Sequence, residues 1–136
     1  TVTKLITKKS ITVKTPSSPG FVANIGRTGF YRVKYDDGIL LDLKMLVDQK
    51  QIPHVDRWAI QNDLFALCIA GKEDVANYLD FTDAYFDEDS YLPLTNVANN
   101  LNFLASLIVQ RFLSVARNNF PYWMIMFPVK TFGRQI

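Results

Sequence analysis

The hydrophobic pattern of the chain changes its period at Asp36-Asp37-Gly38, and this change limits the folds that the chain can adopt. Before it, β-branched and aromatic residues alternate with other residues, as in Ile11-Thr12-Val13 and in residues 30–35, which predicts short strands. After it, apolar residues recur every three or four positions, which predicts helices. A run of strands followed by a run of helices indicates an α+β chain of two units, not an interleaved parallel sheet.

The predicted β region covers residues 1–37. Strands are expected over residues 2–6, 11–13, 21–25 and 30–35, joined as antiparallel hairpins. Gly26 and Gly29 mark the turn that delivers the last strand. One face of that strand carries side chains that we assign to the core, namely Tyr31, Val33 and Tyr35. On the other face, Arg32 is either an ordinary surface residue or the partner of an acid in the helical unit, where it would fix the angle between the two units.

The predicted α-helical region covers residues 38–136. A first helix is expected over residues 39–49, and a second is expected to start near Pro53 and Asp56 and to stop at Gly71. Shorter helices are expected over residues 73–79 and 82–86. After a break at residues 92–95, the strongest helical pattern of the chain is formed by Val97, Leu101, Leu104, Ile108, Phe112 and Val115.

Composition excludes several classes of protein. Hydrophobic residues make up 49% and charged residues 21% of the chain, which is enough apolar material for a globular core. A net charge of +2 does not predict nucleic-acid binding, and no apolar run is long enough to cross a membrane. The single cysteine, Cys68, lies on an apolar stripe and predicts a buried thiol in a reducing, cytoplasmic compartment. The chain starts at Thr1 and not at Met, so we expect a piece of a longer protein.

The sequence carries no metal or catalytic motif. His54 is the one histidine, so a zinc site with two histidine ligands is excluded within these residues. A catalytic triad around His54 lacks a nucleophile elbow. The acidic runs Asp36-Asp37-Gly38 and Asp87-Glu88-Asp89 are better explained by helix capping than by a bound cation. We therefore expect no catalytic, cofactor-binding or metal-binding residue in this chain.

Three motifs resemble one enzyme family. Gly26-Arg27-Thr28-Gly29-Phe30-Tyr31-Arg32-Val33-Lys34-Tyr35-Asp36 resembles a signature of the gluzincin zinc aminopeptidases, the family of aminopeptidase N and the tricorn-interacting aminopeptidases. The segment that starts at Asp56-Arg57 and includes Asp63 is similar to a helix of that family. Residues 85–94 are similar to a third family segment, with Leu94 where tryptophan is usual. Together the motifs cover about residues 20–105, in the family's order.

The resemblance implies that residues 1–37 end a β-sandwich domain and that residues 38–136 begin a solenoid-like C-terminal helical domain. In that family, zinc and the catalytic residues belong to a catalytic domain upstream, which removes N-terminal residues from peptides. The helical domain closes over it and restricts access. The residues that we expect to build the structural junction are Gly26, Gly29, Tyr31, Arg32, Tyr35, Asp56, Arg57 and Asp63.

The expected partner is the catalytic domain of the parent aminopeptidase, and a peptide substrate is contacted only indirectly. We also expect the isolated segment to self-associate, because a severed β half leaves strand edges and its helices lack partners. The apolar residues 120–128 are expected to pack against absent helices or another copy. The alternative is a stand-alone α+β interaction module without enzymatic activity.

Overall fold

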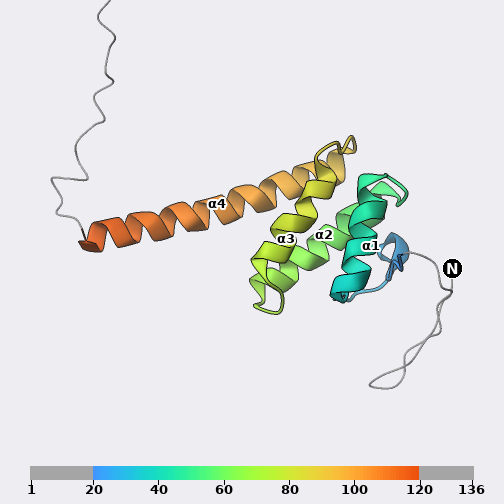
Figure 1. The fold of residues 1–136 in the computed structure, drawn as a ribbon, viewed down its shortest axis with the longest axis horizontal. Helices are drawn as coiled ribbons and strands as arrows, with labels where there is room; N and C mark the ends of the chain where they lie inside the picture. Colours follow the sequence, from blue (N-terminus) through green and yellow to red (C-terminus); the bar gives the residue numbers. More distant parts are fainter. Residues whose placement is uncertain (1–19, 120–136) are drawn as a thin grey trace, which may run out of the picture.

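A computed structural model of the chain describes residues 20–119. In chain order, the elements are η1 (Ile25–Arg27), α1 (Asp37–Asp48), α2 (His54–Ile69), α3 (Val75–Thr82), η2 (Asp83–Tyr85) and α4 (Tyr91–Asn119). Figure 1 shows α1, α2 and α3 gathered side by side, with α4 starting among them and projecting far beyond them. We call residues 20–90 the body and residues 105–119 of α4 the arm.

The first three helices begin and end close to the predicted positions. Asp36 caps α1, since its carboxylate accepts a hydrogen bond of 2.9 Å from the amide of Ile39, as expected for this acidic run. Gly71 follows α2 with φ +65°, which confirms the predicted stop. Asp74 caps α3 by accepting from the amide of Ala76 at 2.8 Å.

Helix α4 corrects one expectation. The predicted break at residues 92–95 is wrong, because α4 already begins at Tyr91 and runs through Pro93 without interruption. Pro93 lies in the first turn, where a backbone amide has no partner within the helix, so proline removes no hydrogen bond there. Its side chain is fully buried. Proline at this position therefore begins a helix and does not end one.

The core lies where the first three helices meet the start of α4. Its buried members are Leu43, Val47, Ile52, Ile60, Leu64, Cys68, Tyr78, Phe81, Ala84, Tyr85 and Val97. Cys68 is buried, as predicted, and burial raises the pKa of its thiol. The helical stripe of α4 contributes Val97 to this core, but the same stripe is exposed farther along the helix.

The predicted N-terminal β region is wrong where the structure tests it. Residues 20–36 form η1 and irregular chain, and residues 20–119 contain helices and no strand. The expected antiparallel β-sandwich, and with it the α+β fold class, is therefore replaced by a helical fold. The strands expected over residues 2–6 and 11–13, and the packing of residues 120–128, lie outside the described residues. The division into regions 1–37 and 38–136 stays a prediction.

Side chains replace the strand ladder in residues 21–35. Asn24 has φ 57°, and its side chain accepts from the amide of Gly29 at 2.7 Å and donates to the carbonyl of Gly29 at 2.9 Å. The amide of Ala23 donates to the hydroxyl of Tyr35 at 3.1 Å. Because these backbone groups are already paired, a neighbouring strand is not needed to satisfy them. The alternation of residue types in this segment does not show that its backbone groups bind side chains.

Candidate functional site

The carboxylate of Asp63 on α2 organises the segment that precedes the helices. Its Oδ1 accepts from Nη1 of Arg27 at 2.8 Å and from Nη1 of Arg32 at 2.9 Å. Its Oδ2 accepts from the backbone amide of Val33 at 3.1 Å. The Asp63 side chain is only 4% exposed. A buried carboxylate needs such donors, because burial without them would carry a large desolvation penalty.

The two arginines approach Asp63 from different surroundings. Arg27 has φ 58°, and its guanidinium lies 5.3 Å from the ring centroid of Trp58, which adds a cation–π contact. Arg32 is half-exposed and also donates to the carbonyl of Asn62 at 3.4 Å. Arg32 thus meets an acid of a helix, which is the second of the two roles considered for it. How it affects an angle between domains stays a prediction.

A second carboxylate of α2 holds the turn that contains the predicted glycines. The amide of Gly26 donates to Oδ1 of Asp56 at 2.6 Å. Gly26 has φ +67°, a conformation that other residues rarely adopt. A Cβ on Gly29 would lie 2.3 Å from the ring of Tyr31, so a side chain at this position would require Tyr31 to move. Gly26 therefore serves the contact with α2 through its backbone conformation, and Gly29 makes room for the ring of Tyr31 within the turn.

The tyrosines of the predicted core face behave differently from each other. Tyr31 is 56% exposed, so its assignment to the core is wrong. Tyr35 is half-buried and packs against the core. Burial, the largest influence, raises the pKa of Tyr35, although its bond with the amide of Ala23 works in the opposite direction. Without a strand, nothing forces Tyr31 and Tyr35 onto one face.

Arg57 of α2 forms a second buried ion pair, on the side of the loop before α4. Its Nε and Nη2 donate to the two carboxylate oxygens of Glu88 at 2.8 and 2.6 Å. Nη1 donates to the carbonyl of Ile52 at 2.7 Å, and the hydroxyl of Tyr85 donates to the carbonyl of Arg57 at 2.7 Å. The Arg57 and Glu88 side chains are 6% and 2% exposed. This bidentate geometry fixes the position of the loop against α2.

A network of neutral side chains joins α2, α3 and α4. The hydroxyl of Tyr78 donates to Oε1 of Gln61 at 3.2 Å, and Asn100 donates to both of these atoms at 3.1 Å. Gln61 also donates to Asn96. Burial is the main influence that raises the pKa of Tyr78 to about 12, so its hydroxyl stays protonated near neutral pH. The root of α4 is thus held by hydrogen bonds without charge.

The structure brings together five of the eight residues assigned to the junction, because Gly26 and Arg32 bind α2, which carries Asp56, Arg57 and Asp63. Gly29 and Tyr35 form contacts within the preceding segment, and Tyr31 is exposed. Sequence reasoning missed Asn24 and Arg27. It assigned Glu88 to capping, and Glu88 does accept from the amides of Asp89 and Ser90 just before α4, but its pairing with Arg57 was missed. The available sequence signal was the number of polar residues within α2. Four of them are buried in the structure: Asp56, Arg57, Gln61 and Asp63.

The buried acids of the junction serve to position their neighbours. Every buried acid described above already accepts bonds from guanidinium or amide groups. His54 is exposed at the start of α2. Within residues 20–119, no three His, Cys, Asp or Glu side chains are grouped so that they could hold a metal ion. In the same part of the chain, no helix is long and apolar enough to cross a membrane.

Removing the charge of Asp63 is expected to weaken the junction strongly. Asp63→Asn leaves two guanidinium groups without their carboxylate, and we expect a loss of about 2–4 kcal/mol in the free energy of unfolding. The matched control is Asp87→Asn, since Asp87 is exposed, and it should change stability by less than about 0.5 kcal/mol. Urea unfolding followed by circular dichroism measures both. Equal effects of the two changes would contradict the role of Asp63.

The Arg57–Glu88 pair predicts a pH dependence of stability. Burial alone would raise the pKa of Glu88, but its bonds from Arg57 and from the amide of Ser90 together lower it below the ordinary 4.5. The stabilisation is therefore complete above pH 4.5 and is lost as the pH falls through the lower folded-state value. Unfolding of wild type and Glu88→Gln should differ at neutral pH and converge in acid. A difference that does not depend on pH would exclude this contribution.

Comparison with known proteins agrees with the resemblance seen in the sequence. The ERAP1-like C-terminal domain family matches residues 21–123. Aminopeptidase M1-A of Oryza sativa subsp. japonica is 36% identical over 74 residues, which are 54% of this chain and 8% of that protein. Leucyl aminopeptidase of Saccharolobus solfataricus is 30% identical over 94 residues, 69% of this chain and 11% of that protein.

A third relative is tricorn protease-interacting factor F2 of Thermoplasma acidophilum, 32% identical over 81 residues, which are 60% of this chain and 10% of that protein. The chain thus spans only about a tenth of the length of these curated relatives. No solved structure matches the chain significantly. With the family match covering most of its length, the chain belongs to the ERAP1-like C-terminal domain family and is similar to a segment of M1 aminopeptidases.

Proposed function

We propose that this chain is a non-catalytic part of a zinc-dependent aminopeptidase that supports the peptide-binding cleft and limits access to it. The parent reaction is hydrolytic removal of N-terminal residues from peptides. The family match and the aminopeptidase names of the relatives support this proposal. The partner is the catalytic domain of the parent, and the peptide is contacted only indirectly.

The observation that carries the proposal is the set of donors on the Asp63 carboxylate. Arg27, Arg32 and the amide of Val33 all bind this one group, so the segment ahead of α1 has a defined direction relative to α2. A domain that shapes a cleft has to be held at a fixed angle to the part that it covers. A buried carboxylate with several donors gives such a joint more rigidity than a flexible linker does.

The non-catalytic role rests on the residues that zinc hydrolysis requires. A gluzincin site uses two histidines one helical turn apart and a glutamate that activates water. With His54 as its one histidine, this chain does not supply that set. The zinc ion of the proposed parent therefore belongs to its catalytic domain. The same proposal places the protein in the cytoplasm, where the single thiol of Cys68 would stay reduced.

One observation favours a second candidate. The arm exposes large apolar side chains, among them Ile108 and Phe112, and such a surface is typical of a protein-interaction site. The alternative function is therefore a stand-alone helical interaction module. The two candidates differ in what the gene encodes ahead of residue 1. A His-Glu-x-x-His sequence upstream favours the aminopeptidase part, and a start codon directly before Thr1 favours the module.

The chain alone should not hydrolyse aminopeptidase substrates. We expect no release of chromophore from aminoacyl chromogenic substrates in the presence of zinc, because the chain cannot supply the two histidine ligands. Catalysis by a purified relative such as the leucyl aminopeptidase serves as the positive control. Zinc-dependent hydrolysis that co-purifies with the chain would contradict the non-catalytic role.

The access role predicts a change in the preference for peptide length. In the polypeptide that joins this chain to its catalytic domain, Asp63→Asn should loosen the junction without touching the reacting groups. We therefore expect kcat/KM for long peptides to rise relative to that for a single-residue chromogenic substrate. Asp87→Asn should leave the ratio unchanged. An Asp63→Asn enzyme with an unchanged ratio would argue against restriction of access by this part.

A further inference from the structure

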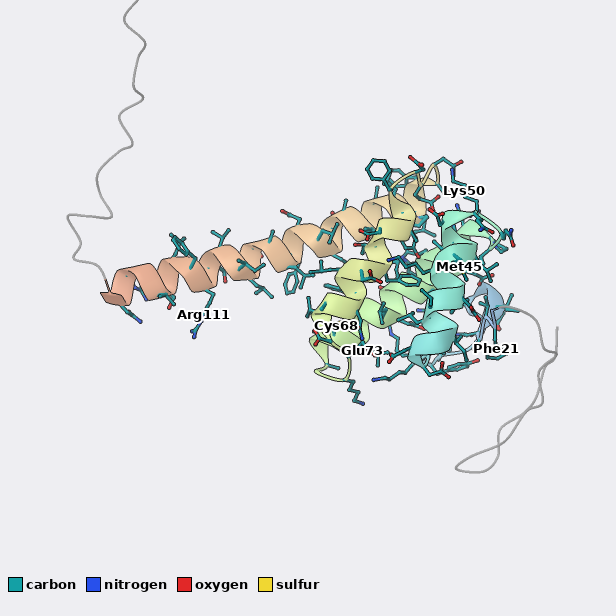
Figure 2. The ribbon with its side chains drawn as sticks, viewed as in Figure 1. Phe21, Met45, Lys50, Cys68, Glu73 and Arg111 are labelled. Carbon is teal, nitrogen blue, oxygen red and sulfur yellow. The ribbon has the colours of Figure 1, made fainter. Side chains whose placement is uncertain are left out.

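The chain between Val22 and Tyr35 forms a loop whose two ends lie together. The amide of Ala23 donates to the hydroxyl of Tyr35 at 3.1 Å, and both Val22 and Tyr35 pack against the core. A compact loop with its ends close together is an Ω-loop, a kind of loop that frequently serves a function. We call residues 23–34 the flap. Figure 2 shows Phe21, the residue directly ahead of Val22, at the edge of the body.

Hydrogen bonds inside the flap join its first half to its second half. The side chain of Asn24 binds both the amide and the carbonyl of Gly29, at 2.7 and 2.9 Å. Its Nδ2 also donates to the carbonyl of Tyr31 at 3.4 Å. These bonds connect the turn around η1 with the residues that follow it. We therefore expect the flap to move as one unit.

The flap buries little apolar surface. Asn24 is the one buried residue among residues 23–34, and the large apolar side chains of Ile25, Phe30 and Tyr31 are exposed. Asn24 and Arg27 also have φ angles of 57° and 58°, which are unfavourable for residues other than glycine. A segment with few buried apolar contacts opens at a lower free energy than the core does. The closed position of the flap therefore depends on its polar contacts.

The polar contacts attach the flap to α2 and to the turn after it. Two attachments are the bonds to Asp56 and Asp63 described above. The third is made by Lys34, whose Nζ donates to the carbonyl of Lys72 at 2.6 Å and lies 3.1 Å from the carboxylate of Glu73. All three attachments involve the same helix or its C-terminal turn, so the flap can leave them together.

We propose that the flap is a conformational device that lifts off α2 as one unit, while Val22 and Tyr35 stay packed against the core. In the closed state, Asp56 and Asp63 are 4% and 3% exposed. They are seven positions apart and therefore lie on the same side of α2, two turns from each other. Opening uncovers both carboxylates, so the flap controls whether this side of α2 presents anionic groups.

The device depends on contacts within residues 22–73. It is therefore independent of the proposed aminopeptidase role, and a failure of one does not affect the other. Opening of the flap also differs from unfolding of the body, because the core is formed by the helices and not by the flap. A measurement that separates local opening from global unfolding is needed to test it.

Native-state hydrogen exchange of the full chain, followed by NMR, provides this measurement. The amides of Gly26 and Val33 report on the flap, and the amide of Leu64, in the middle of α2, reports on the body. Protection at Gly26 and Val33 should be at least about tenfold lower than at Leu64. Low concentrations of urea should change it little, because local opening exposes little surface, whereas protection at Leu64 should fall with urea.

A variant tests whether the flap opens as one unit. Asp56→Ala removes the acceptor of Gly26 and leaves the acceptor of Val33 in place. It should nevertheless lower protection at both amides, by roughly tenfold, the loss expected for a hydrogen bond to a charged group. The matched control is Glu88→Gln, which weakens the body away from the flap. It should lower protection at Leu64 and leave the two flap amides unchanged.

Three results would overturn the proposal. Normal protection of Val33 in Asp56→Ala would show that the attachments open independently. Equal protection and equal urea dependence at Gly26, Val33 and Leu64 would show that the flap opens only when the whole body unfolds. A loss of protection at the flap amides in Glu88→Gln would show the same coupling to the body.

Discussion

A buried carboxylate on α2 decides the course of the chain before the first helix. Asp63 binds two guanidinium groups and a backbone amide that come from a segment about thirty residues earlier. Each of these donors would otherwise need water or a neighbouring strand. Asp63 therefore satisfies one backbone amide that a β-ladder would otherwise satisfy and also anchors two arginines, so the segment is held against α2 without a strand.

Helix α2 is the element to which the rest of the body is attached. Asp56 and Asp63 hold the preceding segment, Arg57 holds the loop before α4 through Glu88, and Gln61 binds side chains of α3 and α4. The helix thus buries polar residues on several faces. Buried polar groups of this kind contribute less to stability than to the choice of one arrangement, because any other arrangement would leave them unpaired. The position of each neighbour is specified by its hydrogen-bond partner on α2.

The helices could be predicted because their signals are local. Apolar spacing placed α1 and α2, Asp36 and Gly71 marked their limits, and Cys68 was assigned to the core by its place on an apolar stripe. The absence of strands in residues 20–36 could not be predicted from the pattern, because alternating residue types do not identify the hydrogen-bond partners of the backbone amides. The family motifs identified Arg57 and Asp63, but not their partners. Arg57 and Glu88 are 31 positions apart, and a pair at that separation has no local signal.

The attachments of α2 differ in physical kind, and this has a consequence for how the body comes apart. The segment 24–33 and the loop at Glu88 are held by ionised groups, whereas the root of α4 is held by Gln61, Tyr78 and Asn100, which are uncharged near neutral pH. Acid protonates carboxylates but leaves amide side chains unchanged. Acidification would therefore act on the loop at Glu88, whose pKa is lowered by Arg57, and leave the hydrogen bonds at the root of α4 unchanged.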